Sequence, residues 1–195
     1  MDQFVAAVRA GKADQIDQAL AQAGSQKQRI LSQVHSLGFT LLGEAARCGK
    51  TEVVRVLVNH GSNINERDPQ LLATPLINAV CHCHEGLPSP SPLLSSSILP
   101  PSPHPLLLTF FFCPEVLLFL LTQTNLDVNI ADRNKHAALH WAILLDHEPW
   151  ARLLLEKGAR HDLTTDKKQT PLHLAGPFPR PSLDHTPPHL PPFSP

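Results

Sequence analysis

The chain has 195 residues and is 42% hydrophobic, which is enough for one ordinary core, but its 20 prolines are too many for a fully folded chain of this length. The formal net charge of -1 offers no broad attraction for phosphate backbones or anionic lipid, so we expect no nucleic-acid and no membrane partner. The N-terminus lacks the basic and apolar segments of a signal peptide, and four cysteines do not suggest a disulfide framework. We therefore expect free thiols and a cytoplasmic or nuclear location.

Residues 2–24 contain two runs with helical apolar spacing, separated by Ala10-Gly11-Lys12 and followed by Gly24. This pattern predicts a pair of helices. Four related segments follow, and each is expected to open a helix because threonine caps free N–H groups and proline suits the first helical position. They read TLLGEAA from Thr40, TPLINAV from Thr74, AALHWAI from Ala137 and TPLHLA from Thr170.

A second apolar run follows each of the first three openings, at residues 52–58, 115–121 and 150–155. The runs end at Gly61, Asn125 and Gly158, which are residue types that tolerate a left-handed backbone. Short polar segments then lead to the next opening. The repeating unit is therefore helix, turn, helix and a hairpin-like connection.

These residues resemble the ankyrin repeat, whose T-P-L-H-x-A opening appears almost unchanged at residues 170–175. The openings at 40 and 74 are 34 residues apart and those at 137 and 170 are 33 apart, close to the family period of about 33. The resemblance implies an all-α solenoid with short hairpin loops, in which His140 and His173 brace neighbouring repeats. The implied organisation is a degenerate capping repeat at 2–39, repeats at 40–73, 74–136 and 137–169, a truncated repeat at 170–175 and a disordered tail at 176–195.

An insert interrupts the repeat at 74–136. The openings at 74 and 137 are 63 residues apart, and removing the 29 residues 86–114 restores a spacing of 34. Proline, leucine, serine and phenylalanine dominate this segment, so we expect it to be disordered. Two origins stay open for the insert and the tail: retained introns, favoured by the pyrimidine-rich codons of these residue types, or natural proline-rich segments. Because the last repeat stops within its first helix, we expect a longer parent protein.

Three other kinds of site are weighed against this interpretation. The apolar run Leu106–Leu121 is shorter than the roughly 20 residues that span a bilayer, and it contains a Pro-Glu pair. Cys81-His82-Cys83-His84 offers zinc-type ligands, but neighbouring residues at a helix end point to different sides, so we expect no metal. No nucleophile-base pair and no phosphate-binding loop is apparent, so we predict neither catalysis nor a cofactor.

The resemblance implies that a protein partner binds a concave surface formed by hairpin tips and the exposed ends of the first helices. The matching positions are Phe39, Arg47, Cys48, Cys81, His82, Arg133, Asn134, His136, Leu144, Leu145, Asp166, Lys167 and Gln169. Among them, the apolar Leu144 and Leu145 are suited either to anchor a partner or to pack sideways against the array. We predict a noncatalytic adaptor or scaffold. The alternative is a regulatory region of a larger enzyme, such as a kinase or ubiquitin ligase.

Overall fold

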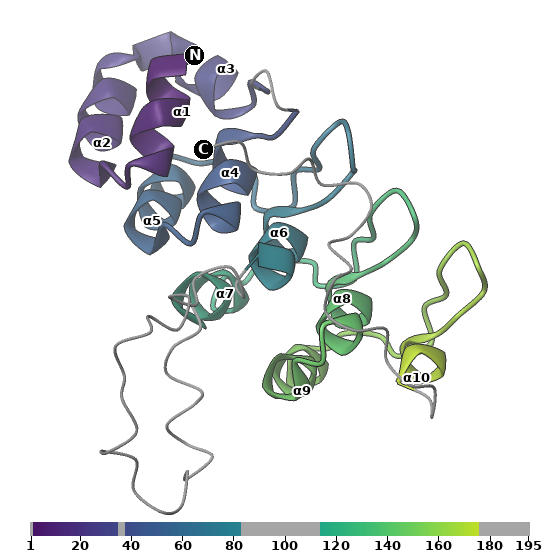
Figure 1. Cartoon of the computed structure of the whole chain (residues 1–195). Helices are drawn as coiled ribbons and strands as arrows, with labels where there is room; N and C mark the ends of the chain where they lie inside the picture. Colours follow the sequence, from purple (N-terminus) through teal and green to yellow (C-terminus); the bar gives the residue numbers. More distant parts are fainter. Residues whose placement is uncertain (1, 35–37, 83–113, 176–195) are drawn as a thin grey trace, which may run out of the picture.

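The computed structural model describes residues 2–34, 38–82 and 114–175, and these residues form a stack of helices (Figure 1). The helices in chain order are α1 (Asp2–Arg9), α2 (Ala13–Gln22), the short 3-10 helix η1 (Gly24–Gln26), α3 (Lys27–Leu31), α4 (Leu41–Arg47), α5 (Thr51–Asn59), α6 (Pro75–His82), α7 (Pro114–Leu121), α8 (Ala138–Leu144), α9 (Glu148–Glu156) and α10 (Pro171–Leu174). Extended pairing within the described residues is limited to two isolated bridges, Val34 with Thr40 and Ala131 with Ala137. The all-α class is confirmed.

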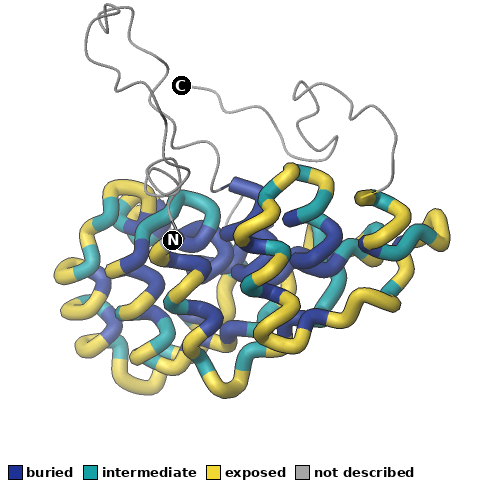
Figure 2. Tube along the Cα trace, turned by 90° about the horizontal axis from the view of Figure 1, so that it is seen from below, coloured by how far each residue is buried: buried dark blue, intermediate teal, exposed yellow. Residues whose placement is uncertain are grey.

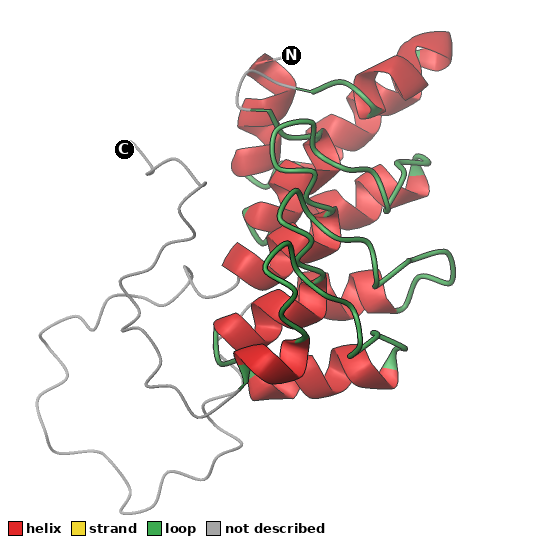
Figure 3. Ribbon diagram, turned by 90° about the vertical axis from the view of Figure 1, so that its right-hand side faces the viewer, coloured by secondary structure: helices red, strands yellow, loops and turns green. Residues whose placement is uncertain are grey.

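The helices form two rows that run side by side. The first row is α1, α4, α6, α8 and α10, and the second is α2, α5, α7 and α9 (Figures 1 and 3). Hairpin loops project from the side of the first row, between one helix pair and the next. This arrangement is a solenoid, because each pair packs on its neighbours along the stack.

The predicted helix openings form N-caps, but one of them uses different chemistry. The hydroxyls of Thr40 and Thr74 accept hydrogen bonds from the backbone N–H groups of Gly43 and Ile77, at 3.0 and 3.3 Å. Ala137 has no hydroxyl. Instead, its own N–H donates to Nδ1 of His140 at 3.2 Å, so the ring ties down the start of α8.

One apolar core runs along the whole stack. It extends from Val8 in the first helix pair, through Leu57 and Leu76, to Leu154 in the last pair, and all four side chains are almost fully buried. Buried and exposed positions mix along α5 and α9, whereas every residue of α6 is buried (Figure 2). The leucine-rich helices are therefore core elements, because each repeat buries its apolar face only by stacking.

The left-handed turn positions differ in part from those predicted. Gly61 and Gly158 have φ of 90° and 86°, as expected, but Asn125 is not among the residues with positive φ. Instead, Asp146 has φ of 59° in the turn between α8 and α9, where the equivalent turns of the earlier helix pairs have Gly11 and Gly49. Leu72, Lys135 and Lys168 also have positive φ, each two residues before a helix opening.

The helix pair at the predicted insert is intact on both sides of it. Helices α6 and α7 contact each other although residues 83–113 separate them. Pro114, predicted as the last insert residue, is the first residue of α7. The remaining insert, the tail at 176–195 and the hypothesis of their origin lie outside the described residues.

The second row opens between α7 and α9. A groove of about 420 Å³ lies there, lined by Leu117, Leu118, Pro149, Trp150, Arg152, Leu153 and Glu156. Leu118 is 46% exposed at this site. On the opposite side of the same junction, α6 and α8 of the first row are in contact.

Candidate functional site

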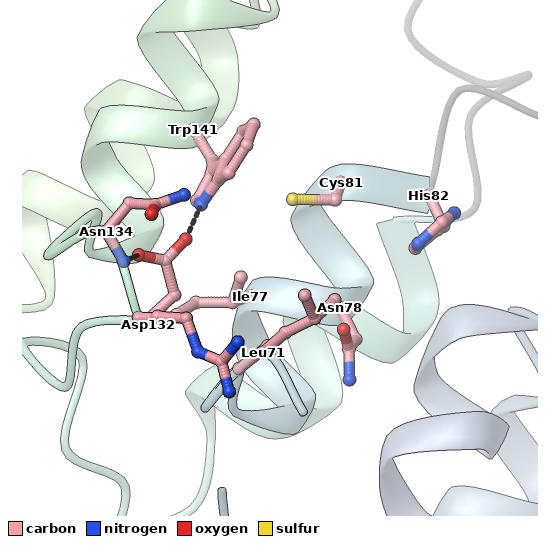
Figure 4. Close-up of a pocket in the computed structure, with 10 residues that line it drawn as sticks. Leu71, Ile77, Asn78, Cys81, His82, Asp132, Asn134 and Trp141 are labelled. Atoms are coloured by element: carbon pink, nitrogen blue, oxygen red, sulfur yellow. Dashed lines mark hydrogen bonds between the residues drawn. The ribbon is translucent and has the colours of Figure 1, made fainter. Parts of the chain in front are cut away.

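A small pocket lies between two consecutive repeats, on the side of the hairpin loops (Figure 4). Its volume is about 140 Å³. One wall comes from α6 and the loop before it, and the other comes from the next hairpin and α8. The lining residues are Leu71, Ala73, Ile77, Asn78, Cys81, His82, Asp132, Arg133, Asn134 and Trp141. We call the surface formed by the hairpin loops and the first-row helices around this pocket the hairpin face.

Hydrogen bonds between successive hairpins hold the two walls of the pocket together. The N–H of Arg133 donates to the carbonyl of Leu71 at 2.8 Å. A guanidinium nitrogen of Arg67 donates to the carbonyl of Ala131 at 2.7 Å. These bonds fix one hairpin against the next, so the pocket is set by backbone geometry as well as by side chains.

Asp132 organises the polar side of the pocket. Its Oδ1 accepts from the N–H groups of Asn134 and His136 at 2.9 and 2.8 Å, and its Oδ2 accepts from Nε1 of Trp141 at 3.0 Å (Figure 4). Burial favours the neutral carboxyl, but hydrogen bonds from His136 and Trp141 outweigh it and lower the pKa of Asp132. The carboxylate thus stays charged and holds the indole of Trp141 at the pocket.

A second buried carboxylate joins the repeat before the pocket to the one that forms it. Asp68 is 1% exposed, and it accepts from the N–H of Thr40 and from Nδ2 of Asn78, each at 2.8 Å. Burial raises the pKa of Asp68 to about 6, against the opposing effect of these two hydrogen bonds. The nearby Gly43 leaves room for the network, because a Cβ there would lie 3.0 Å from Oδ1 of Asp68.

The predicted partner residues of the first clear repeat are part of a structural network instead. The side chain of Glu44 is fully buried, and it accepts from Nε of Arg9 at 2.6 Å and from Nε of Arg47 at 2.9 Å. Only 8% of the Arg47 side chain is exposed, and its guanidinium lies 5.3 Å from the ring centre of Phe39, which is itself buried. Sγ of the half-buried Cys48 lies 3.8 Å from Glu44.

Phe39 and Arg47 are therefore not presented at the surface, and the expectation of exposure was wrong for them. Arg9 from the first helix pair and Arg47 both donate to the buried carboxylate of Glu44 on α4, so this end of α4 belongs to an ion-pair network inside the stack. Burial favours neutral Glu44, but the hydrogen bonds from Arg47 and Arg9 dominate and lower its pKa to about 2.

Cys81 and His82 reach the pocket but are not exposed helix ends. They are 7% and 6% exposed, so the expectation of a surface position was wrong for both. They line the pocket together with Arg133, which is exposed, and Asn134, which is half-buried. The structure thus brings four predicted residues, two from α6 and two from the following hairpin, to one site.

The other predicted residues lie around or beyond the pocket. The ring of His136 is half-buried, with its centre 5.3 Å from that of Trp141. Leu144 is 44% exposed and Leu145 is half-buried at the end of α8, and neither lines the pocket. On the following hairpin, Asp166 and Lys167 are exposed and Gln169 is half-buried.

The sequence interpretation did not include the lining residue Trp141 among the candidate site residues. It occupies the fifth position of the repeated opening, where the other copies have Glu44, Asn78 and Leu174. This position varies while the next position is alanine in all four copies, and in each of the three complete repeats its side chain makes a polar contact. That variation was the available signal.

His140 has the bracing role expected from the resemblance. It is fully buried, and its Nε2 lies 3.1 Å from the carbonyl of Leu163 in the next hairpin. Since Nδ1 accepts a hydrogen bond from Ala137, Nε2 is the protonated nitrogen and donates to that carbonyl. Burial lowers the pKa of His140, which favours this neutral ring.

Neither a metal centre nor a membrane span emerges from the described residues. Nowhere in the ranges 2–34, 38–82 and 114–175 do three histidine, cysteine or acidic side chains gather closely enough to hold an ion. Helices in the same ranges are all too short or too polar to cross a bilayer. Cys83 and His84 of the zinc-like sequence, and residues 106–113 of the apolar run, lie outside the described residues.

The fold defines a helical-repeat protein with a pocket between two of its repeats. Sequence comparison agrees: a family model described as ankyrin repeats (3 copies) matches residues 110–177, and one described as ankyrin repeat matches residues 37–69. The chain belongs to the ankyrin-repeat family. Ankyrin repeats are protein-interaction modules, and this assignment indicates a protein partner.

Curated relatives are matched over little of their own length, and two of the three described here match over most of this chain. Neurogenic locus notch homolog protein 1 from Homo sapiens is 30% identical over 154 residues, which is 77% of this chain and 6% of the relative. The same protein from Danio rerio is 30% identical over 147 residues, again 6% of its length. Palmitoyltransferase ZDHHC17 from Danio rerio is 44% identical over 57 residues, which is 29% of this chain and 9% of that protein.

Proposed function

We propose that the protein is a noncatalytic adaptor or scaffold that binds its protein partner on the hairpin face, with one partner side chain in the pocket between α6 and α8. The observation that carries this proposal is the pocket itself. Its lining combines apolar side chains, including Leu71, Ile77 and Trp141, with the polar side chains of the exposed Arg133 and the half-buried Asn134. An apolar centre ringed by polar groups is the usual anatomy of a protein interface.

The size of the pocket suits a single anchoring side chain. A cavity of roughly 150 Å³ lined by apolar side chains accepts a benzene molecule, and this pocket has about 140 Å³. Anchors of this kind carry much of the energy of an interface, because they lie where water is excluded. Trp141 and Arg133 are then contact residues, while Leu144 lies at the edge of the same face.

The proposal is tested with a phage-displayed random peptide library selected against the full chain. Selected peptides are remeasured by fluorescence anisotropy against Trp141→Ala, Arg133→Ala and the control Arg29→Ala, whose exposed side chain lies on α3. We expect either pocket variant to weaken binding at least about tenfold, and the control to leave it unchanged. Circular dichroism verifies that each variant is folded. Peptides that bind all variants equally would refute the proposed site.

A second candidate is a regulatory segment beside a catalytic domain in one polypeptide. The observation that favours it is the similarity to part of a protein named as a palmitoyltransferase. An antibody raised against residues 40–82 distinguishes the two. Mass-spectrometric sequencing of the captured product that finds a catalytic domain in the same polypeptide supports the regulatory segment, whereas a product without such a domain supports the adaptor.

A further inference from the structure

We propose that the partner segment recognised on the hairpin face is acidic, and that it places carboxylates along the hairpin tips on either side of the side chain held in the pocket. This inference rests on the proposed function and specifies the chemistry of the partner. The hairpins are residues 66–73, 132–136 and 165–169. The inference is carried by their charges, because their exposed charged side chains are mainly basic and their buried charged side chains are acidic.

The three hairpin tips form one continuous edge. Arg67 bonds to the carbonyl of Ala131, which links the first tip to the second. The N–H of Asp166 donates to the carbonyl of Asn134 at 3.2 Å, which links the second tip to the third. A partner chain that lies along this edge therefore meets side chains from all three hairpins in succession.

Exposed basic side chains outnumber exposed acidic ones on this edge. The exposed bases are Arg67, Arg133, Lys135, Lys167 and Lys168, and the exposed acid is Asp166. Nζ of Lys135 lies 3.6 Å from Oδ1 of Asp166, so the exposed carboxylate already forms an ion pair with a base of the same edge. The edge is positive although the chain as a whole has a formal net charge of -1.

The other acids of the hairpins are turned inward. Asp68 and Asp132 are 1% and 8% exposed, and both are occupied by hydrogen bonds within the repeats. Glu66 is half-buried. In contrast, the side chains of Arg133, Lys167 and Lys168 are not paired with a carboxylate in the part of the chain that the structure describes.

These three bases are available to a partner, and Arg133 also lines the pocket. A carboxylate next to the anchoring side chain would meet Arg133 first, in the planar two-point geometry that guanidinium groups favour. Carboxylates further along the partner would meet Lys167 and Lys168. Rim charges of this kind act mainly on association rate and specificity, so binding should weaken as salt rises.

A basic edge also attracts nucleic acid, but the pocket argues for a peptide. The pocket is lined by apolar side chains such as Leu71 and Ile77 and has about 140 Å³, which suits one apolar amino-acid side chain, whereas a phosphate backbone has no apolar group to place there. Binding of an oligonucleotide is therefore one of the outcomes to be measured.

The test uses the full chain and the same random peptide library, and reads the sequences of peptides whose binding depends on Trp141. We expect these peptides to be enriched in aspartate and glutamate flanking one large apolar residue. The double variant Arg133→Glu/Lys167→Glu should weaken their binding at least about tenfold at low salt. The charge-matched control Arg29→Glu/Lys12→Glu, with both sites exposed and in the N-terminal part of the stack, should not.

The outcomes separate this inference from the proposed function. Pocket-dependent peptides without an acidic bias would overturn the inference and leave the proposed site standing. A selection with no pocket-dependent peptide would overturn both. A single-stranded oligonucleotide that binds as tightly as the peptides, and is lost in the same double variant, would also overturn the inference.

Discussion

Replacing Glu44 by glutamine should destabilise the protein strongly at neutral pH and hardly at all in acid. Glu44 is fully buried and is the shared acceptor of Arg9 and Arg47. Glutamine keeps the shape of the side chain but removes the negative charge. Arg47, whose side chain is 8% exposed, then loses the carboxylate that accepts hydrogen bonds from its buried guanidinium.

The size of the effect follows from the pKa of Glu44, which is lowered from 4.5 to about 2. A group with a lowered native pKa stabilises the fold above its unfolded pKa, and the contribution is lost as the pH falls through the native pKa. The shift corresponds to about 3 kcal/mol, and we expect roughly 2 to 3 kcal/mol because Arg9 is 44% exposed and therefore screened. Total stabilities are about 5 to 15 kcal/mol, so such a loss is large.

The assay is urea unfolding followed by far-ultraviolet circular dichroism, at a series of pH values from neutral to about 2. The difference between wild type and Glu44→Gln should shrink as the pH falls below 4.5 and approach zero near the native pKa. The matched control is Glu52→Gln, whose exposed carboxylate lies 3.5 Å from Arg55 and should matter by less than about 0.5 kcal/mol. An equal loss at every pH would mean that packing, and not charge, explains the effect.

Three further predictions test other parts of the structure. His140→Phe should cost roughly 2 to 4 kcal/mol in urea unfolding, because two buried backbone groups lose their partner, whereas the exposed His173→Phe should cost far less. Gly43→Ala should lower the melting temperature despite the better helix propensity of alanine, because a Cβ there meets atoms at 3.0 to 3.1 Å; an unchanged or higher value would contradict the packing argument. The raised pKa of Asp68, about 6, means that the neutral carboxyl favours the folded state, so the free energy of unfolding should fall as the pH rises from 3.8 through 6. Asp68→Asn should remove this fall. A fall that persists in the variant would mean that another group causes it.

The repeat organisation was predictable because its signals are local. Thr40 and Thr74 cap their helices through neighbouring backbone groups, and the apolar periodicity of each second helix lies within a few consecutive residues. The second helices start and end within two residues of the predicted runs. Even the broken repeat was recoverable, because α6 and α7 pair as the restored spacing required.

The site was less predictable because its chemistry is long-range. Arg47 and Phe39 occupy positions that the resemblance places at the surface, but Arg9 from another helix pair completes a buried network around Glu44. Cys81 occupies a similar position and instead lines the pocket between two repeats. Which side chains stay exposed depends on residues more than thirty positions away, and a motif does not contain that information.

The contact between α6 and α8, next to the pocket, is suited to act as a hinge between two helix pairs. Helices α6 and α8 touch, while the groove between α7 and α9 lies on one side of that contact and the pocket lies on the other. If the α6/α7 pair rotated as a rigid body against the α8/α9 pair about this contact, the pocket would narrow as the groove widened, and the reverse. A partner side chain held in the pocket, as proposed, would keep that gap open and would thereby oppose opening of the groove on the other side of the contact.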